Sequence, residues 1–224
     1  MADPKTQGFQ DAMLEPRTLD SEAEITLGLL NAVHENSALT QRSIARDLGI
    51  ALGLANAYLK RCVKKGLIKV SQVPANRYAY YLTPQGFSEK SRLTAEYLSS
   101  SFGFFRAARG QCTDAFMRCA EKGWLRVGLA GTGDLGEIAT LCALETPVVL
   151  AGFIEAGVRG SDKFAGLPVV GSLGELGDID AVLVTDLRAP QETYERMAAA
   201  LPFERLFVPR LLHVSRNGAN IVVE

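Results

Sequence analysis

The sequence has few of the residues that build metal centres or redox pairs. Its cysteines are Cys62, Cys112, Cys119 and Cys142, with no Cys-x-x-Cys spacing, and only two histidines occur. Zinc sites and thioredoxin-type redox pairs depend on such closely spaced residues. We therefore expect no metal site, and we expect four reduced, buried thiols.

Long apolar runs are also missing. No stretch approaches the roughly 18 apolar residues that a membrane-spanning helix needs. The chain starts with MADPKTQGFQD, which has no basic segment followed by an apolar one, so we expect no signal peptide. These absences predict a cytoplasmic protein without a membrane partner.

The net charge is close to zero, at −1 for 224 residues, but the charges are unevenly distributed. Residues 40–77 contain eight basic residues and one acidic residue, whereas residues 110–224 contain ten basic and fifteen acidic ones. A basic block beside an acidic region predicts a nucleic-acid partner for the first part only. A solvated helix face is the alternative interpretation of that block. The length suits two small domains.

The first part of the chain has the pattern of a helix-turn-helix. Residues 1–20 show no periodicity and are expected to form a flexible tail. Three helices are then expected, over residues 21–35, 41–48 and 52–65. Gly49 turns the chain between the last two helices, and Gly66 ends the third. A short helix, a glycine turn and a longer helix are typical of this motif.

A hairpin after the third helix predicts the wing of a winged helix-turn-helix. Residues 67–70 and 78–82 have strand character, and the loop expected between them, over residues 72–76, contains a proline. The winged helix-turn-helix domain is therefore expected over residues 21–84, in the α+β class.

A long helix is predicted after the wing. Thr83 can cap it and Pro84 suits its first position, and the helical pattern continues to about Lys122. We expect a break in this helix near Gly110. Residues 85–123 are interpreted as a helical linker or dimerisation region. A long helix that leaves a small winged domain is often a dimer contact, so we expect a homodimer; a linker packed on its own chain is the alternative interpretation.

The third helix is the element expected to enter the major groove of double-stranded DNA. Ala55, Leu59, Cys62 and Val63 are predicted to form its buried face. The candidates for DNA contacts lie on its other faces, on the second helix and on the wing: Arg42, Arg46, Leu52, Gly53, Asn56, Ala57, Lys60, Arg61 and Arg77.

These candidates have different expected roles. Asn56 can pair with an adenine edge, and Lys60 can meet a guanine or a phosphate. Arg42, Arg46 and Arg77 are phosphate candidates, which position the protein without reading sequence. A solvated helix residue is the alternative interpretation of Asn56.

Two segments of this first part resemble a known family. The stretches SIARDLGIALGLANAYLKRCVKKGLIKV and YAYYLTPQGFSEKSRLTAEYL resemble small MarR-family regulators associated with exopolysaccharide gene clusters, over roughly residues 22–105. The resemblance implies a transcription regulator of such genes. Ala51 stands where these proteins usually have a serine cap, a difference that costs about 1 kcal/mol of helix stability.

The second part of the chain alternates strands with helices. Strands are expected over residues 125–130, 148–154, 169–170, 181–185 and 206–208, with helices over residues 134–144 and 190–201. This alternation predicts a parallel, doubly wound sheet of the α/β class, a small Rossmann-like domain over residues 124–224.

The first strand of this domain leads into GLAGTGDLG, which contains Gly131-x-Gly133-x-x-Gly136 between a strand and a helix. This context predicts a nucleotide-binding turn. The first glycine allows the turn, the second lets a phosphate approach, and the third lets the helix pack on the strand. Thr132, Asp134 and Leu135 complete the candidate phosphate loop.

Acidic residues near this loop favour one ligand over another. Glu155 lies close to the position of the carboxylate that binds a ribose 2′-hydroxyl, which favours NAD over NADP. A solvated glutamate is the alternative interpretation. Asp134 argues against an anion at the loop and can instead serve the helix dipole. Thr185, Asp186 and Arg188 follow the fourth strand at the ligand-binding edge, where Arg188 can meet a phosphate or is simply solvated.

The second part resembles two families. Its glycine pattern behind a winged helix is similar to Rex redox sensors, which bind NADH, although the long C-terminal helix of Rex dimers is missing. The stretches GFIEAG, GLPVVGSLGEL and DAVLVTD resemble the nucleotide-binding domain preceding polysaccharide-type sugar epimerases and the related CoA-binding-like domains. The Tyr-x-x-x-Lys pair of the epimerases is absent, and no other catalytic set replaces it.

The sequence therefore predicts a DNA-binding transcription regulator rather than an enzyme, with no catalytic residues. NAD(H) or a nucleotide sugar is the expected effector. Two alternatives stay open: a nucleotide-sugar-modifying enzyme or oxidoreductase, and a regulator whose Rossmann-like domain is a ligand-free interaction module.

Overall fold

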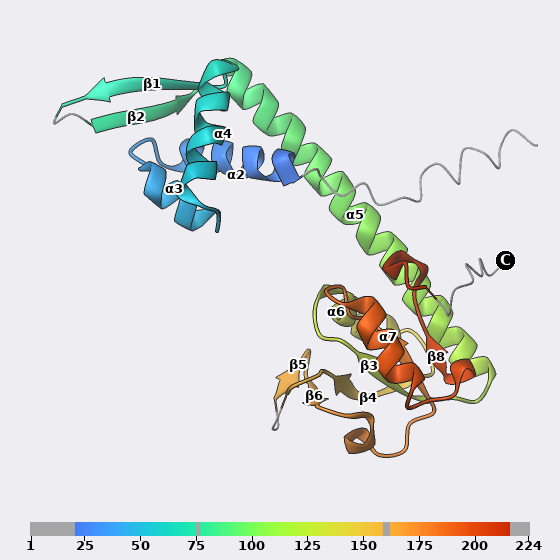
Figure 1. Ribbon diagram of the computed structural model, residues 1–224. Coiled ribbons are helices and arrows are strands. Elements are labelled where there is room, and N and C mark those ends of the chain that lie inside the picture. The colour runs from blue at the N-terminus through green and yellow to red at the C-terminus, as the bar shows by residue number, and fades with distance from the viewer. Residues whose placement is uncertain (1–20, 75–76, 159–161, 216–224) are drawn as a thin grey trace, which may run out of the picture. The chain divides into compact units, whose positions relative to one another are not determined.

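The structure is a computed structural model that describes residues 21–74, 77–158 and 162–215 (Figure 1). The chain divides into two compact units, residues 1–103 and residues 104–224, and the division falls inside helix α5 (Pro84–Glu121). Residues 104–121 of this helix therefore belong to the same unit as the sheet. The tail predicted over residues 1–20 lies outside the described residues.

The first unit begins with three helices that match the prediction closely: α2 (Ser21–Glu35), α3 (Gln41–Asp47) and α4 (Leu52–Lys64). Thr40 caps α3, and the Thr40 and Ser43 side chains bind each other's backbone N–H groups in a capping box. Gly49 adopts φ +64° in the turn before α4, which favours glycine because it has no Cβ. The buried side chains of Leu29, Leu30 and Ile44 centre the core of this unit.

The wing is a two-stranded antiparallel hairpin of β1 (Ile68–Val73) and β2 (Arg77–Leu82). Gln72 and Val73 were expected in the loop, and this was wrong, because their backbone pairs with Tyr78 and Arg77 of β2. A proline at position 74 ends the strand only after this extra pairing.

Helix α5 begins against the turn that follows α4. The Thr83 hydroxyl donates a hydrogen bond to the Gly66 carbonyl at 2.6 Å and accepts one from the Gly86 N–H at 3.0 Å, so it caps α5 as predicted. A Cβ on Gly86 would lie 2.0 Å from the carbonyl oxygen of Leu67. The LTPQG segment therefore holds the start of α5 in direct backbone contact with the start of the wing.

The break predicted in this helix near Gly110 is wrong, because α5 continues unbroken to Glu121. Nothing lies within 4 Å of a Cβ built on Gly110, so this glycine faces open space. A glycine inside a helix costs only about 1 kcal/mol. Ala108 and Cys112, on either side of it, are fully buried in the core of the second unit and hold the helix in place.

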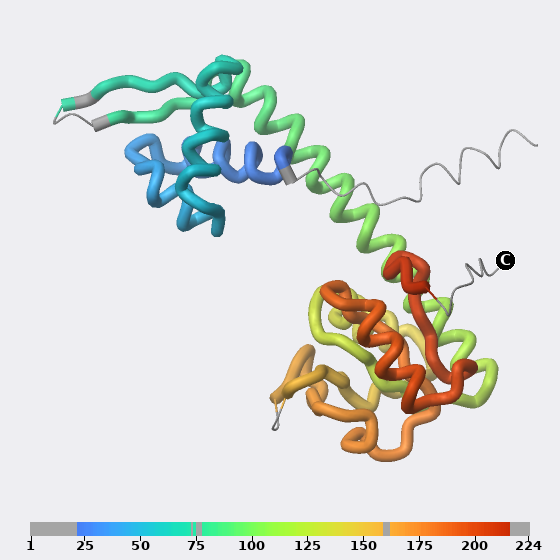
Figure 2. The backbone as a smooth tube through the Cα atoms, viewed as in Figure 1, coloured from blue at the N-terminus to red at the C-terminus, as the bar shows by residue number. Residues whose placement is uncertain are grey.

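The second unit contains a six-stranded sheet in the order β5-β6-β4-β3-β7-β8. Its strands are β3 (Arg126–Ala130), β4 (Val149–Ile154), β5 (Lys163–Phe164), β6 (Leu167–Val170), β7 (Ala181–Val184) and β8 (Leu206–Phe207). All neighbours pair in parallel except β5, which forms a short antiparallel edge that the sequence analysis missed. The chain builds the sheet outward from β3 in both directions, so the strand order reverses there. Figure 2 traces the path of the backbone, coloured by residue number.

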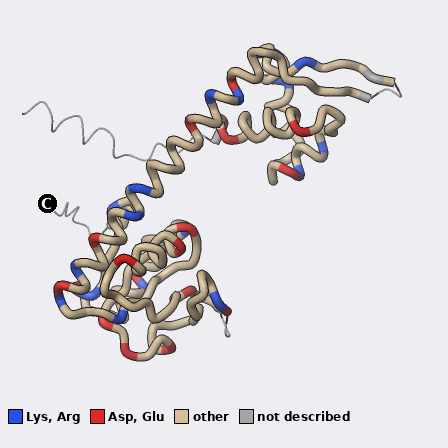
Figure 3. The backbone as a smooth tube through the Cα atoms, turned by 180° about the vertical axis from the view of Figure 1, so that it is seen from behind, with Lys and Arg blue, Asp and Glu red and all other residues tan. Residues whose placement is uncertain are grey.

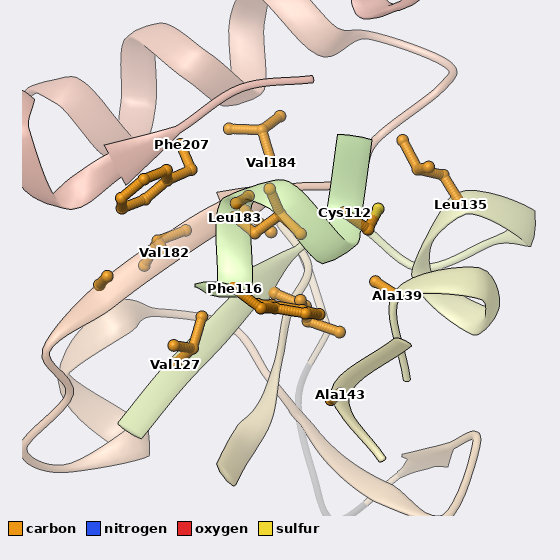
Figure 4. Close-up of a cluster of buried hydrophobic side chains, with 14 of the residues drawn as sticks. Cys112, Phe116, Val127, Leu135, Ala139, Ala143, Val182, Leu183, Val184 and Phe207 are labelled. Carbon is orange, nitrogen blue, oxygen red and sulfur yellow. The ribbon is translucent and has the colours of Figure 1, made fainter. Parts of the chain in front are cut away.

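Helices cover this sheet. Helix α6 (Asp134–Ala143) connects β3 to β4, and α7 (Pro190–Ala198) connects β7 to β8. Short 3₁₀ helices are also present: η1 (Leu173–Leu176) between β6 and β7, η2 (Phe203–Arg205) between α7 and β8, and η3 (Arg210–Leu212) after β8. Cys112 and Phe116 of α5 face the sheet beside Leu135 of α6 (Figure 4). The four cysteines of the chain are all buried and free, as predicted.

Candidate nucleic-acid interface and glycine-rich loop

The glycine-rich loop lies at the carboxyl end of β3, and each of its glycines has a different surrounding. Gly131 adopts φ +111°, and a Cβ there would lie 2.5 Å from the Asp186 Cα. A Cβ on Gly136 would lie 2.7 Å from the ring of Phe153 on β4. Gly133 adopts φ +134°, and nothing lies within 4 Å of its Cβ position. The first and third glycines are therefore required by packing, and the second borders open space.

Glu155 follows β4 directly and reaches this loop. Its Oε2 atom accepts hydrogen bonds from the Thr132 N–H at 2.8 Å and from the Thr132 hydroxyl at 2.9 Å. The structure thus brings Glu155 to the loop, as its spacing from Gly131 led us to expect. The contact with Thr132 was not foreseen, because nothing in the sequence indicates that a carboxylate will bind the loop itself.

The residues after β7 are also engaged with the fold. The Thr185 hydroxyl is buried and donates to the Gly131 carbonyl at 2.6 Å. Asp186 accepts hydrogen bonds from the Arg188 N–H at 2.8 Å, the Ala189 N–H at 3.2 Å and the Thr193 hydroxyl at 2.7 Å, at the start of α7. Burial acts to raise the pKa of Asp186, but these hydrogen bonds outweigh it and hold the pKa below its usual value.

Three further candidates at this loop differ in exposure. Leu135 is fully buried and belongs to the core, whereas Asp134 is exposed in the first turn of α6. The guanidinium of Arg188 is exposed and forms no ion pair with another described residue. Arg188 is thus the candidate whose side chain is available to an anion.

Two absences hold for residues 21–74, 77–158 and 162–215. In these ranges no three histidine, cysteine, aspartate or glutamate side chains gather in a way that could hold a metal ion. None of the helices formed by these residues combines the length and apolar character needed to cross a membrane.

In the first unit, α4 presents one face to the core and the opposite face to solvent. Ala55, Tyr58, Leu59 and Cys62 form the buried face. Val63 was predicted to belong to it, and this was wrong, because its side chain is 36 % exposed. Tyr58 takes that place, since residues three and four apart share one side of a helix.

The exposed face of α4 contains most of its predicted contacts. Gly53, Ala57 and Lys60 are exposed, and Leu52 is exposed at the start of the helix. Asn56 is half-buried at the border of this face, and its Oδ1 atom is buried without a hydrogen-bond partner among the described residues. Ala51, which precedes the helix, makes no side-chain cap.

The comparisons with known proteins concern this same region. Residues 22–69 match the family described as winged helix-turn-helix DNA-binding. The match covers α2, α3, α4 and the start of β1, which are the elements described above. The N-terminal unit is a winged helix-turn-helix. None of the curated proteins matches this chain.

Several solved structures show some similarity to this chain. PcaV from Streptomyces coelicolor is 21 % identical, with 55 % of this chain and 98 % of that chain covered and a TM-score of 0.38. A MepR mutant from S. aureus bound to an oligodeoxyribonucleotide is 24 % identical, with 45 % and 73 % covered and a TM-score of 0.32. A MarR family protein of Mycobacterium tuberculosis in complex with p-aminosalicylic acid is 17 % identical, with 54 % and 98 % covered and a TM-score of 0.36.

Figure 3 colours the positions of Lys and Arg along the backbone. The predicted arginines of the winged helix-turn-helix differ in what they contact. Arg61 pairs with Glu22 of α2 and lies over the Tyr58 ring, 5.0 Å from its centroid. Arg46 pairs with the adjacent Asp47 at 3.1 Å. Arg42 is exposed and forms no ion pair with another residue that the structure describes. The side chain of Arg77 lies outside the described part of the chain.

The winged helix-turn-helix also contains a groove that the sequence analysis did not find. It has a volume of about 370 Å³ and lies between α4 and the wing, lined by Leu59, Lys60, Val63 and Lys64 of α4 and by Val70 and Tyr80 of the wing. Lys64 was not among the predicted contacts. Its position one helical turn after Lys60 is a signal that could have identified it.

Proposed function

We propose that the protein is a transcription regulator whose winged helix-turn-helix unit binds double-stranded DNA. The observation that carries this proposal is the exposed face of α4, where Gly53, Ala57 and Lys60 stand together on a unit that matches DNA-binding domains. A helix of this kind fits the major groove. The excess of basic over acidic residues in residues 40–77 supports a polyanionic partner.

The residues of this face have different roles in the proposal. The small side chains of Gly53 and Ala57 let the helix approach the base edges closely, and Ala57 can contact a thymine methyl group. Arg42 binds a phosphate, and Lys60 binds a phosphate or a guanine. Asn56 reads a base through its amide after a small rotation, which would also give its buried Oδ1 a partner.

The test measures binding of the full chain to a pool of random-sequence duplexes at increasing salt, by fluorescence anisotropy. We expect affinity to fall linearly on a logarithmic plot, and Lys60→Ala to reduce the slope by about 1. Lys69→Ala is the matched control, because Lys69 alternates with the groove-lining Val70 on β1 and so faces the other side of the wing. Absence of salt-dependent binding by the wild type would contradict the proposal.

We propose further that two copies of the chain act together. Helix α5 exposes large apolar side chains near its middle, at Tyr97, Leu98, Phe102 and Phe105. Covering such residues is the usual role of a partner, and a two-fold dimer presents two recognition helices to half-sites about one helical turn apart. Sedimentation velocity should show a dimer for the wild type and a monomer for a Leu98→Glu, Phe102→Glu variant.

The proposed effector is NAD(H) or a nucleotide sugar bound by a Rossmann-like second unit. The strand order, which reverses at β3, and the loop at the carboxyl end of β3 support this site. Open space at Gly133 leaves room for a phosphate near the first turn of α6. Glu155 would hold a ribose hydroxyl through the oxygen that does not bind Thr132, and Arg188 would meet a phosphate. Exopolysaccharide genes are the proposed target.

The second candidate is a regulator whose Rossmann-like unit binds another protein and no nucleotide. The contact between Glu155 and Thr132 favours it, because a carboxylate of the chain already occupies donors of the loop. The missing Tyr-x-x-x-Lys pair leaves an enzyme as the least supported alternative.

Calorimetry with NAD⁺, NADH and UDP-glucose separates these candidates. Binding of one of these ligands, its loss in Gly133→Ala, and a change in duplex affinity when it is present would support the sensor. A folded wild type that binds none of the three would leave the protein-binding module as the better explanation.

A further inference from the structure

The groove between α4 and the wing has two kinds of surface. Its walls are apolar, formed by Leu59 and Val63 of α4 and by Val70 of β1. Lys60 and Lys64 line it from α4. Apolar walls with ammonium groups beside them suit a molecule that combines an apolar part with a negative charge.

The two lysines are free to bind such a molecule. Lys60 and Lys64 are one helical turn apart, so they lie on the same side of α4, and both are exposed. Neither forms an ion pair with any residue in the described ranges, in contrast to Arg61, which pairs with Glu22. Because their charges are not neutralised within the chain, both ammonium groups are available to an anion.

The wing contributes hydroxyl groups to the same groove. Tyr78 and Tyr80 of β2 both line it, as side chains two residues apart on a strand share one face. Tyr80 is buried, whereas Tyr78 is 58 % exposed. Tyr81 is also exposed but lies on the opposite face of β2. The wing therefore directs one exposed aromatic hydroxyl, that of Tyr78, to the groove side.

We infer that this groove seats a sugar–phosphate segment of the DNA backbone beside the base pairs that α4 reads. Lys60 and Lys64 bind the phosphates, and the apolar walls contact the deoxyribose. The Tyr78 hydroxyl and the carboxamide of Gln41, at the start of α3, donate to phosphate oxygens. The inference rests on the proposed DNA binding and adds Lys64, Tyr78 and Gln41 to its contacts.

Charge is what selects DNA as the occupant. Residues 40–77 contain a single acidic residue, Asp47, and it is already paired with Arg46. Within residues 40–77 the uncompensated charges are therefore all positive, and most of the residues that line the groove, next to the exposed face of α4, belong to this segment. A duplex placed on that face has its own backbone within reach of the wing, since the major groove is bordered by phosphates.

The first experiment compares Lys64→Ala with Lys65→Ala in the full chain, with the random-sequence duplex pool and a salt titration. Both variants remove one positive charge at the end of α4, but Lys65 does not line the groove. We expect Lys64→Ala to reduce the slope of log K against log salt by about 1 and to weaken binding roughly tenfold at about 0.1 M salt. Lys65→Ala should leave the slope unchanged. Equal slopes for the two variants would overturn the inference.

The second experiment uses the two faces of β2. Tyr78→Ala should weaken duplex binding. Tyr78→Phe should lose only the share of the affinity that the hydroxyl contributes, and Tyr81→Ala should bind the duplex as tightly as the wild type does. Thermal melting of each variant checks that the unit remains folded. Equal losses for Tyr78→Ala and Tyr81→Ala would overturn the role of the groove, because only Tyr78 lines it.

The outcomes separate this inference from the proposal on which it rests. A wild type without salt-dependent duplex binding contradicts the proposed function itself. If the wild type binds the duplex and Lys64→Ala has the same slope of log K against log salt, only the inference about the groove is overturned. Benzoate, a small apolar anion, tests the groove for small molecules. If the wild type binds benzoate, Lys64→Ala abolishes that binding, and the slope of log K against log salt for DNA stays unchanged, the groove is a small-molecule site and the inference is also overturned.

Discussion

The two units differ in what their polar side chains already contact. On the winged helix-turn-helix, Lys60 and Lys64 are exposed and unpaired within the described residues. On the second unit, Glu155 binds Thr132, and Thr185 binds the Gly131 carbonyl. Polar residues at the ends of parallel strands can therefore stabilise the turn that they surround. A pattern that predicts a ligand also predicts such internal pairing, and only the three-dimensional structure distinguishes them.

The largest expected effect tests whether the loop glycines belong to the fold. Gly131→Ala should destabilise the second unit by about 4 kcal/mol or more, because its Cβ would lie 2.5 Å from the Asp186 backbone. Gly133→Ala meets no atom within 4 Å, so it should cost only the backbone strain at φ +134° and ψ −169°, about 1–3 kcal/mol. Urea unfolding followed by circular dichroism measures both. Similar losses would show that packing does not distinguish the two glycines.

Glu155→Gln sharpens the comparison by removing the charge that holds Thr132. We expect the free energy of unfolding to fall by about 1.5–3 kcal/mol, the usual range for a hydrogen bond to a charged group. Glu204→Gln, an exposed position in η2, is the control. A variant of unchanged stability that loses nucleotide binding would make Glu155 a ligand contact rather than a support of the loop.

Asp186→Asn tests the start of α7 through pH. The pKa of Asp186 is lowered in the folded chain, so its ionised form stabilises the fold above the unfolded pKa of about 3.9. This contribution is lost as the pH falls through the lower, folded pKa. The variant should therefore be less stable than the wild type at pH 7, by about 1 kcal/mol, and the difference should shrink in acid. Denaturation at several pH values measures it, and a difference independent of pH would contradict this explanation.

The smallest expected effect concerns the winged helix-turn-helix, where one helix is capped and the next is not. Ala51→Ser should raise stability by about 0.5–1 kcal/mol, because a serine hydroxyl can accept from the first N–H groups of α4. Thr40→Ala, at the capped start of α3, should lower stability by about 1 kcal/mol. Thermal melting compares them, and a loss of stability in Ala51→Ser would mean that the hydroxyl finds no partner.

The sequence was sufficient where local chemistry sets the boundaries. The bounds of helices α2, α3 and α4 were predicted to within one residue. Thr40 caps α3, Gly49 turns the chain before α4, and Gly66 follows the end of α4. The parallel strands were predicted from short apolar runs, although their ends shifted by one or two residues. These signals depend on neighbours in the chain, which a sequence displays directly.

The features that were missed depend on contacts between distant residues. Val73 belongs to the wing because it pairs with Arg77 across the hairpin. The helix continues through Gly110 because the core of the second unit holds its neighbours. Lys64 lines a groove only because β1 and β2 fold back beside it, and Glu155 meets Thr132 across 23 positions of sequence. No local pattern contains this information.

One hydroxyl group links the start of α5 to the residues that follow α4. Thr83 directly precedes α5, and its hydroxyl is bonded to the carbonyl of Gly66, two residues after the end of α4. Helix α5 is also the single covalent path along which the chain leaves the winged helix-turn-helix. A rotation of the start of α5 would therefore reach the wing through the peptide bond between Leu82 and Thr83, and the residues after α4 through the Thr83 hydroxyl.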